Sequence, residues 1–421
     1  MRQGGWFVVA LVGLTACGGE QGGPPAGGEE AGDPVSRARV VLERTPVFDG
    51  HNDLPWEIRR SEDAPMDVAE YDLREPVPGH TNLDLLEAGG VGAQFWSVYI
   101  PGEYADSGFA RLQLEQVDLA LRMIERYPEL VLAGTAEEVE AAMAEGSVAS
   151  MLGVEGGHAI ENSLGALRVY YDLGARYMTL THNVTLDWVD AAQDSARHGG
   201  LSGFGEEVVR EMNRLGMLVD LAHVSPATMS DALTVSEAPV MFSHSSARAL
   251  TDVPRNVPDS ILARMAANGG VVMVTFVQPF VNQDAADYDD DLGATIRAMR
   301  EAGTPAEEIR AEISRIRRDT PRPSASVDDI ADHIEHVRDV AGIDHVGLGS
   351  DYDGMNAPPE MPDVSSYPVL FARLIERGWT DQELGKLASG NILRALREAE
   401  AVAARLQTER APSTAVITDF D

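Results

Sequence analysis

Cysteine and lysine are almost absent from this 421-residue chain, which holds one residue of each, Cys17 and Lys386. A single cysteine cannot form a disulfide within the chain. Lys386 falls in a helix-like stretch near the C-terminus, away from every predicted strand end. Schiff-base chemistry and a lysine-containing phosphate loop therefore both lack a suitable residue. This shortage excludes several classes of enzyme.

Basic side chains are scarce as a whole, with 33 Lys and Arg against 68 Asp and Glu and a net charge of −35. A phosphate backbone or an anionic membrane surface would be repelled by such a chain, so we expect no nucleic-acid partner. The simplest interpretation of the excess is a solvated acidic surface, which says little about catalysis. Hydrophobic residues make up 44% of the chain, enough for a large core.

The N-terminal segment 1–16 has the pattern of a secretory signal peptide, with Arg2 followed by an apolar run over 6–16 that is too short to span a bilayer. The run ends in the sequence LTAC, which resembles the bacterial lipobox and predicts a lipid on Cys17. Residues 17–34 would then form a flexible Gly- and Pro-rich linker. This pattern predicts an exported bacterial lipoprotein, anchored in the periplasm or at the cell surface by its N-terminal lipid alone. The alternative is a plain signal peptide with an incidental cysteine.

Eight short apolar runs divide the rest of the chain, and six of them carry a His, Asp or Glu at or near the C-terminal end. Helix-like segments lie between most of them, a pattern that indicates parallel strands in βα units and predicts a (β/α)8 TIM-type barrel. The C-terminal strand ends of such a barrel converge on one face, where barrel enzymes place their chemistry. The runs span residues 47–53, 92–99, 148–157, 176–183, 217–225, 240–245, 270–277 and 345–354.

The barrel domain is expected to span residues 35–406, followed by a loose polar tail over 407–421. Residues 281–325, between the seventh and eighth predicted strands, disturb the βα rhythm with an acidic stretch and then a charged helix. Insertions after barrel strands lie over the active face. This segment is therefore either a lid or a solvated surface excursion.

Five residues at the predicted strand ends suit a metal centre. His51 and Asp53 lie two positions apart and so point to the same side of a strand, and they offer the nitrogen and oxygen ligands that zinc prefers. Glu155 follows an apolar strand, where a buried carboxylate is costly unless it is paired or binds metal. His223 and His244 close successive apolar runs, where one histidine alone would more often be a core residue. We predict two ions, one on His51 and Asp53, the other on His223 and His244, with Glu155 bridging them.

Three further residues fit the chemistry of amide hydrolysis. Asp351 is placed to accept and release a proton. The alternative is that Asp351 is a turn residue, a role that Asp353 fits better. His182 ends the fourth strand and is either another ligand or a hydrogen-bond donor to a developing oxyanion. Arg255 lies in a proline-stiffened loop after the sixth strand and would clamp a substrate carboxylate or form a surface ion pair.

These segments together resemble the membrane dipeptidase family, also called renal dipeptidase, a group of dinuclear zinc peptidases. The resemblance runs from about Val47 to Ala399. The matching segments are DGHND at 49–53, GVEGG at 153–157, LTHN at 180–183, LAHVS at 221–225, FSHSSARAL at 242–250, VPRNVPD at 253–259, GLGSDYDG at 347–354 and GNILR at 390–394.

The resemblance implies a (β/α)8 barrel that hydrolyses L,L- and L,D-dipeptides with a hydroxide bridging two zinc ions, and a homodimer. The family's acid/base aspartate falls on Asp351, its histidine near the scissile carbonyl on His182 and its carboxylate-binding arginine on Arg255. The metal ligands of the family fall on His51, Asp53, Glu155, His223 and His244.

One departure from the family concerns the substrate pocket. Family members often carry a Phe-Tyr pair after the seventh strand, whereas this chain has Phe276 and then Val277. The change removes a phenol and puts the side-chain preference in doubt, but it leaves the metal chemistry unchanged.

Two other functions compete with a dipeptidase. The same centre would serve a related amidase, such as an N-acyl-amino-acid deacylase or a β-lactam hydrolase, and a panel of dipeptides and N-acyl amino acids would separate the two. A non-catalytic solute-binding lipoprotein is the rival from a different class, but the complete ligand set together with Asp351 argues against it.

Overall fold

The structure is a computed structural model, and it describes residues 33–102 and 108–420. The predicted signal peptide, Cys17 and most of the linker lie outside the described residues. Eight parallel strands form a closed barrel, which confirms the predicted (β/α)8 fold. The barrel strands are β1 (Val47–Asn52), β2 (Val91–Ser97), β4 (Val148–Glu155), β5 (Ala175–Thr179), β6 (Leu218–Asp220), β7 (Val240–Phe242), β8 (Val271–Val274) and β9 (Val346–Leu348).

Two contacts between strands that are not joined by a single βα unit complete the ring. β2 pairs with β4 over five residue pairs, from Ala93–Ala149 to Ser97–Gly153. The first and last strands meet at Asp49 and Leu348, and the contact is continued by an isolated bridge between Asn52 and Tyr352. One short strand, β3 (Leu130–Leu132), was not predicted from the sequence. It pairs with residues 148–150 at the N-terminal end of β4, before the pairing of β4 with β5 begins at Leu152.

Alternation along the strands separates the barrel interior from the layer under the helices. Phe95, Met151, Tyr177 and Met273 belong to a cluster that fills the interior, whereas their sequence neighbours pack against the outer helices. Glu155 lies four positions after Met151 in β4, so its side chain points to the same face of the strand. The carboxylate is therefore on the inner side, at the mouth of the barrel.

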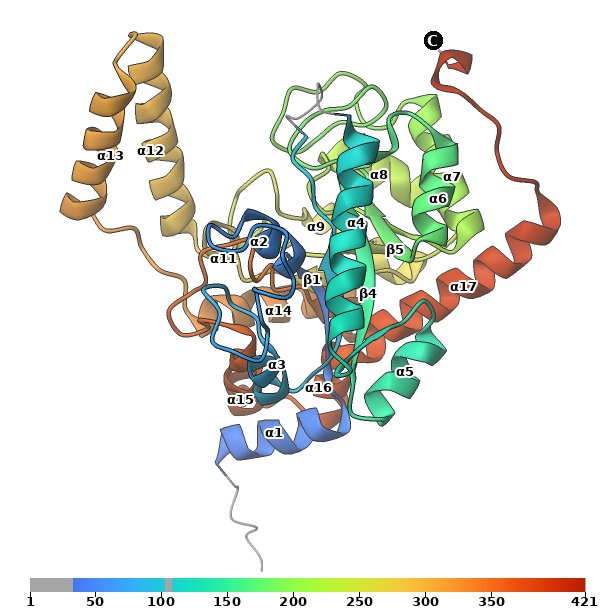
Figure 1. Cartoon of the computed structure of the whole chain (residues 1–421), viewed down its shortest axis with the longest axis horizontal. Coiled ribbons are helices and arrows are strands. Elements are labelled where there is room, and N and C mark those ends of the chain that lie inside the picture. Colours follow the sequence, from blue (N-terminus) through green and yellow to red (C-terminus); the bar gives the residue numbers. More distant parts are fainter. Residues whose placement is uncertain (1–32, 103–107, 421) are drawn as a thin grey trace, which may run out of the picture.

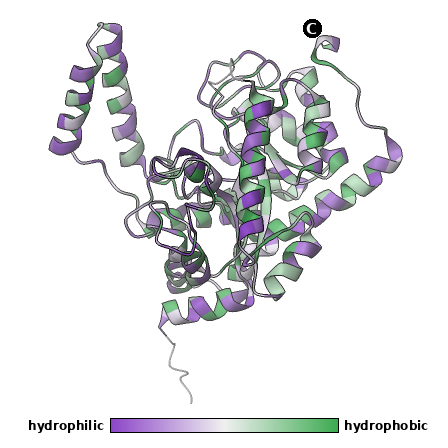
Figure 2. Cartoon of the chain, in the orientation of Figure 1, coloured by the Kyte–Doolittle hydropathy of each residue, from purple (hydrophilic) through white to green (hydrophobic). Residues whose placement is uncertain are grey.

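Helices surround the barrel, and Figure 2 shows polar and apolar residues alternating along α4 and α17, as expected for helices with one buried face. The helices outside the insertion are α1 (Pro34–Arg44), α2 (Leu54–Arg60), α3 (Leu83–Gly89), α4 (Phe109–Arg126), α5 (Ala136–Ala144), α6 (Leu164–Asp172), α7 (Gly203–Leu215), α8 (Pro226–Val235), α9 (Asp259–Leu262), α10 (Met265–Asn268), α14 (Val327–Ala341), α15 (Tyr367–Glu376), α16 (Asp381–Gly385) and α17 (Asn391–Glu409). Among the described residues, no helix combines the length and apolarity needed to cross a membrane.

The insertion between β8 and β9 is a helical hairpin that extends away from the barrel (Figure 1). After the short α11 (Gln278–Val281), it consists of α12 (Gln283–Glu301) and α13 (Ala306–Asp319), two helices where the sequence indicated one. Gln278 ties its base to the barrel, donating to the carbonyls of Asn356 and Ala357 and accepting from the backbone N–H of Ala325.

Residues beyond 406, expected as a loose tail, first complete α17 and then contact helix α7. The backbone N–H of Ser413 donates to Glu211, and the Phe420 ring lies edge-on to that of Phe204, with centroids 6.3 Å apart.

Candidate metal centre

The five predicted ligands meet at the C-terminal mouth of the barrel. His51 lies in β1, and Asp53 follows it at the N-terminus of α2. Glu155 is the last residue of β4, and His223 and His244 come directly after β6 and β7. All five are buried. Residues from four barrel strands are thus brought into one cluster, although they are scattered along the sequence.

The first half of the cluster consists of His51, Asp53 and Glu155. His51 Nε2 lies 3.3 Å from Asp53 Oδ2 and 3.5 Å from Glu155 Oε2. One potential ligand atom from each residue lies within 4.8 Å of the other two. This is the spacing of atoms that share one metal ion.

The second half consists of Glu155, His223 and His244. Glu155 Oε1 lies 3.1 Å from His223 Nε2 and 3.5 Å from His244 Nε2, and this set also fits within 4.8 Å. Glu155 therefore directs one carboxylate oxygen to each half, which is the geometry required of a bridging ligand.

The hydrogen bonds around the histidines direct their Nε2 atoms to the centre. His51 Nδ1 lies 2.8 Å from the Tyr177 hydroxyl, His223 Nδ1 lies 3.0 Å from Asn183 Oδ1, and His244 Nδ1 lies 2.8 Å from Ser243 Oγ. Partners of this kind set the tautomer and orientation of metal-binding histidines.

Buried polar atoms at the centre fit a cation. His51 Nε2 and Asp53 Oδ1 have no hydrogen-bond partner among the described residues, although both are fully enclosed. Buried polar atoms of this kind are costly unless something satisfies them. The donor set of imidazole nitrogens and carboxylate oxygens is the one that zinc and related ions prefer.

The protonation states of the residues in the cluster also favour a bound cation. Burial, reinforced by nearby cations, holds the pKa values of His223 and His244 well below the usual range, so both offer neutral rings. Burial opposes ionisation of Glu155, but the charge of His51 and hydrogen bonds from the histidines hold the pKa of Glu155 well below its ordinary value. The neutral rings of His223 and His244 beside the ionised Glu155 favour a positive charge at the centre. The same demand acts on His51, because burial is outweighed by Tyr177, Glu155 and Asp53, which raise its pKa well above the ordinary value.

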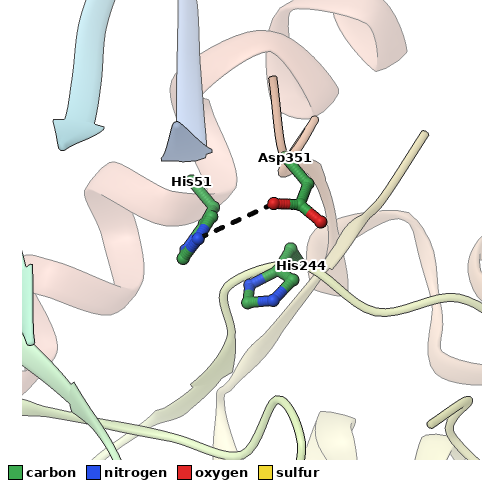
Figure 3. Close-up of side chains that lie close together, drawn as sticks. All are labelled: His51, His244 and Asp351. Atoms are coloured by element: carbon green, nitrogen blue, oxygen red, sulfur yellow. Dashed lines mark ion pairs between the residues drawn. The ribbon is translucent and has the colours of Figure 1, made fainter. Parts of the chain in front are cut away.

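Asp351 faces this centre from the segment after β9. Its Oδ1 lies 3.9 Å from His51 Nε2, and Figure 3 shows Asp351, His51 and His244 directed toward one another. Burial raises the pKa of Asp351 well above its ordinary value, and the carboxylates of Asp53 and Glu155 reinforce this rise. A raised pKa makes the Asp351 carboxylate a stronger proton acceptor than an ordinary aspartate. Asp353, by contrast, accepts from the backbone N–H of His80 at 2.6 Å and is not part of the clusters.

His182 lies at the edge of the second half. Its Nε2 is 3.8 Å from Glu155 Oε1, and its ring centroid is 4.2 Å from that of His223. The side chain is 17% exposed, more than the histidines of the cluster, so it is open to a bound molecule.

Arg255 is buried under the mouth, so it is not a surface ion-pair residue. Its Nη1 donates to Ser245 Oγ at 2.9 Å and its Nη2 to the carbonyl of His244 at 3.0 Å, while Nε has no partner among the described residues. Burial lowers the pKa of Arg255 to about 10, and Asp351 is the leading group that opposes the fall. The guanidinium remains a cation, and part of its donor capacity is unused.

The comparisons with known proteins agree with this geometry. A family model described as "Membrane dipeptidase (Peptidase family M19)" matches residues 35–410. The chain belongs to the membrane dipeptidase family. This confirms the resemblance found in the sequence. Dipeptidase 3 of Mus musculus is 40% identical over 372 residues, which cover 87% of this membrane dipeptidase and 67% of the mouse protein.

Solved structures share the fold of this membrane dipeptidase. The probable dipeptidase PvdM from Pseudomonas aeruginosa has a TM-score of 0.77 at 24% identity, covering 88% of this chain and 99% of that one. The metallopeptidase dipeptidase AC gives 0.70 at 26% identity, covering 84% and 98%. A Rhodobacter sphaeroides metallopeptidase, solved with a phosphinate mimic of L-Ala-D-Ala, gives 0.69 at 24%, covering 84% and 99%.

Membership of this family assigns the class of reaction. This membrane dipeptidase is a hydrolase, and its class of reaction is the metal-dependent hydrolysis of dipeptides.

Several residues that support the site were missed in the sequence. Tyr177 and Asn183 contact the ligands directly, and Asp49 accepts from Ser350 beside Asp351. Only Asn183 and Ser243 carried a local signal, because each is the sequence neighbour of a predicted site histidine. The hydroxyl of Tyr177 meets His51 across the barrel, which no local pattern shows.

Proposed function

We propose that this membrane dipeptidase holds two zinc ions bridged by Glu155 and cleaves L,L- and L,D-dipeptides by attack of a bridging hydroxide. One observation carries the proposal, namely that the two oxygens of Glu155 serve two separate groups of ligands. Two zinc ions in these groups would acidify a shared water and polarise the substrate carbonyl.

The protein's own groups would perform the remaining steps. Asp351 would accept the proton released from the attacking water and pass it to the leaving amine, a role that fits its raised pKa. His182, at the exposed edge of the centre, would donate a hydrogen bond to the oxygen on which negative charge develops. Each proton thus has a group within the mouth of the barrel to receive it.

Arg255 would bind the free carboxylate of the dipeptide with the donors that the protein leaves unused. Arg255 is held by Ser245 and by the carbonyl of His244, so the protein fixes the distance between its guanidinium and the predicted metal ligands. A longer peptide would place its scissile bond away from the centre. The clamp therefore accounts for a preference for dipeptides.

The test is hydrolysis of a panel of L,L- and L,D-dipeptides with and without added zinc, with metal content measured on the same sample. We expect zinc-dependent cleavage and about two ions per chain. Two bound ions without cleavage of any dipeptide would refute the substrate and direct the search to N-acyl amino acids and β-lactams. A protein that binds no metal would refute the whole proposal.

We also propose that the chain is exported and anchored through a lipid on Cys17. The support is the LTAC sequence that follows the apolar run. Mass spectrometry of the protein from membranes of a bacterial host should show a diacylglyceryl group on Cys17. In Cys17→Ser the protein should leave the membrane fraction, and an unchanged distribution would contradict the anchor.

A further inference from the structure

A buried chain of hydrogen bonds leads from His244 into the interior of the barrel. Ser243 Oγ lies 2.8 Å from His244 Nδ1 and 2.7 Å from Asp220 Oδ2. Thr179 Oγ1 donates to the same carboxylate oxygen at 2.5 Å. Thr179, Asp220 and Ser243 are all fully buried. None of the three is a predicted ligand, so the chain lies one layer beneath the metal centre.

The donors around Asp220 fix the direction of this chain. Oδ1 accepts from the backbone N–H groups of Ser243 at 2.7 Å and Ala222 at 3.1 Å. Oδ2 receives the two hydroxyl groups. Four donors on four lone-pair positions satisfy an ionised carboxylate, which has no proton of its own to donate.

The direction of the first bond sets the state of His244. Ser243 gives its only proton to Asp220, so its oxygen is left as an acceptor for Nδ1–H of His244. A neutral imidazole protonated at Nδ1 carries its free lone pair on Nε2. That Nε2 faces the second half of the centre, 3.5 Å from Glu155 Oε1.

We propose that Asp220 is a positioning residue that acts through Ser243 to fix the ring orientation and the tautomer of His244, and thereby tightens the zinc ion held by Glu155, His223 and His244. The inference rests on the proposed two-zinc function. It adds a residue beneath the ligands that controls the affinity of one ion.

The other two histidines show why the effect should be confined to this ion. His51 is held by the neutral hydroxyl of Tyr177, and His223 by the neutral amide oxygen of Asn183. Only the chain from His244 ends on a carboxylate. Removing the charge of Asp220 should therefore weaken the ion on His223 and His244 and leave the ion on His51 and Asp53 in place.

The experiment measures zinc affinity of the full chain by competition with a chromophoric chelator in Asp220→Asn, Ser243→Ala and the double variant. Each single variant should weaken the binding of one zinc ion, the one held by Glu155, His223 and His244, by about 10- to 100-fold and leave the affinity for the other unchanged. Because both residues act in one chain, the double variant should lose no more than the worse single variant. Saturating zinc should restore kcat on a dipeptide, while the zinc concentration for half activity rises.

Two control variants separate positioning from a general effect on folding. Thr179→Val removes the other hydroxyl from Asp220 but keeps the link from Ser243 to His244. Glu211→Gln removes a buried carboxylate on α7 that pairs with Arg214. Both variants should lower thermal stability, but zinc affinity should remain that of the parent.

Unchanged zinc affinity in Ser243→Ala would overturn the proposal, and this variant serves even if Asp220→Asn does not fold. An equal loss of affinity in Thr179→Val would also overturn it, because the effect would then come from packing. The affinity is measured without substrate. A protein that binds two zinc ions as described but cleaves no dipeptide would therefore refute the proposed function and leave this inference standing.

Discussion

Arg255 is a buried cation in a strongly acidic protein, fixed in place by Ser245 and by the carbonyl of His244. Burial of a guanidinium is costly, and the hydrogen bonds of Arg255 go to a hydroxyl and a carbonyl oxygen rather than to a carboxylate. A residue kept under these conditions needs a partner of opposite charge, which the carboxylate of the proposed dipeptide substrate would supply. The residue is therefore the best test of how the substrate is held.

Arg255→Ala should raise KM for dipeptides by at least about 30-fold, because truncating one partner of a buried charge pair costs about 2 kcal/mol or more. Zinc content should remain that of the parent, since Arg255 is not a ligand. Steady-state kinetics with metal analysis on the same sample checks this, and Arg255→Lys shows whether charge alone suffices. Parental KM in the alanine variant would contradict the clamp.

Glu155 and His223 differ in the number of ions that they should hold. Glu155 belongs to both groups of ligands, whereas His223 belongs to one. Glu155→Ala should therefore reduce binding of both zinc ions, and His223→Ala should leave about one ion per chain. Elemental analysis after gel filtration with a mild chelator measures this loss.

Asp353→Asn is a matched control for the ligand variants, because Asp353 is a buried carboxylate close to Asp351 but outside the groups of ligands. It should retain two ions. A full zinc load in both ligand variants would remove their assignment as ligands.

At the scale of elements, the barrel was predictable because its strands lie in short apolar runs, and six of the eight runs carry a His, Asp or Glu near the C-terminal end. The same rule failed for β3, where Val131 and Leu132 are exposed and the strand is only three residues long. The split between α12 and α13 was missed because charge continues through both, although Gly303 and Pro305 mark the turn. The support of His51 by Tyr177 depends on strands that meet only in the closed barrel, so no local pattern contains it.

The hairpin of α12 and α13 contributes little to the core. Ala285, Ala286 and Leu292 are the buried residues of α12, and Ile309 is the one of α13. Replacing residues 287–319 with a short flexible linker should leave zinc content and dipeptide kcat/KM close to those of the parent. Circular dichroism, metal analysis and kinetics on one preparation check this. Loss of activity with both ions retained would instead show that the hairpin acts at the mouth as a lid.

At the scale of the whole molecule, His333 makes folding sensitive to acid. It lies in α14 and accepts from the backbone N–H of Ala247, in the loop that carries Arg255. Burial lowers the pKa of His333 from 6.5 to about 4. The unfolded chain therefore takes up a proton at a higher pH than the folded protein does.

Stability should consequently fall as pH drops from 6.5 to about 4, with no contribution from His333 above this window and the full loss below it. The loss is about 3 kcal/mol. Urea unfolding across this range measures it. His333→Asn keeps an acceptor for Ala247 but does not titrate, so its stability should depend less steeply on pH. Equal slopes in the two proteins would show that His333 is not the group responsible.

The contact between β1 and β9 has a further consequence for how this enzyme fails when heated. The backbone pairing between these two strands is short. Side-chain hydrogen bonds supplement it, because the Asp49 carboxylate accepts from the backbone N–H and the hydroxyl of Ser350. Directly above it, the backbone N–H of Asp351 donates to the carbonyl of His51. The seam where the first and last strands of the barrel meet is thus also the place where His51, a predicted metal ligand, faces Asp351, the predicted proton carrier. Thermal motion that opens this seam would separate the two before the rest of the barrel melts, so turnover would be lost ahead of the fold.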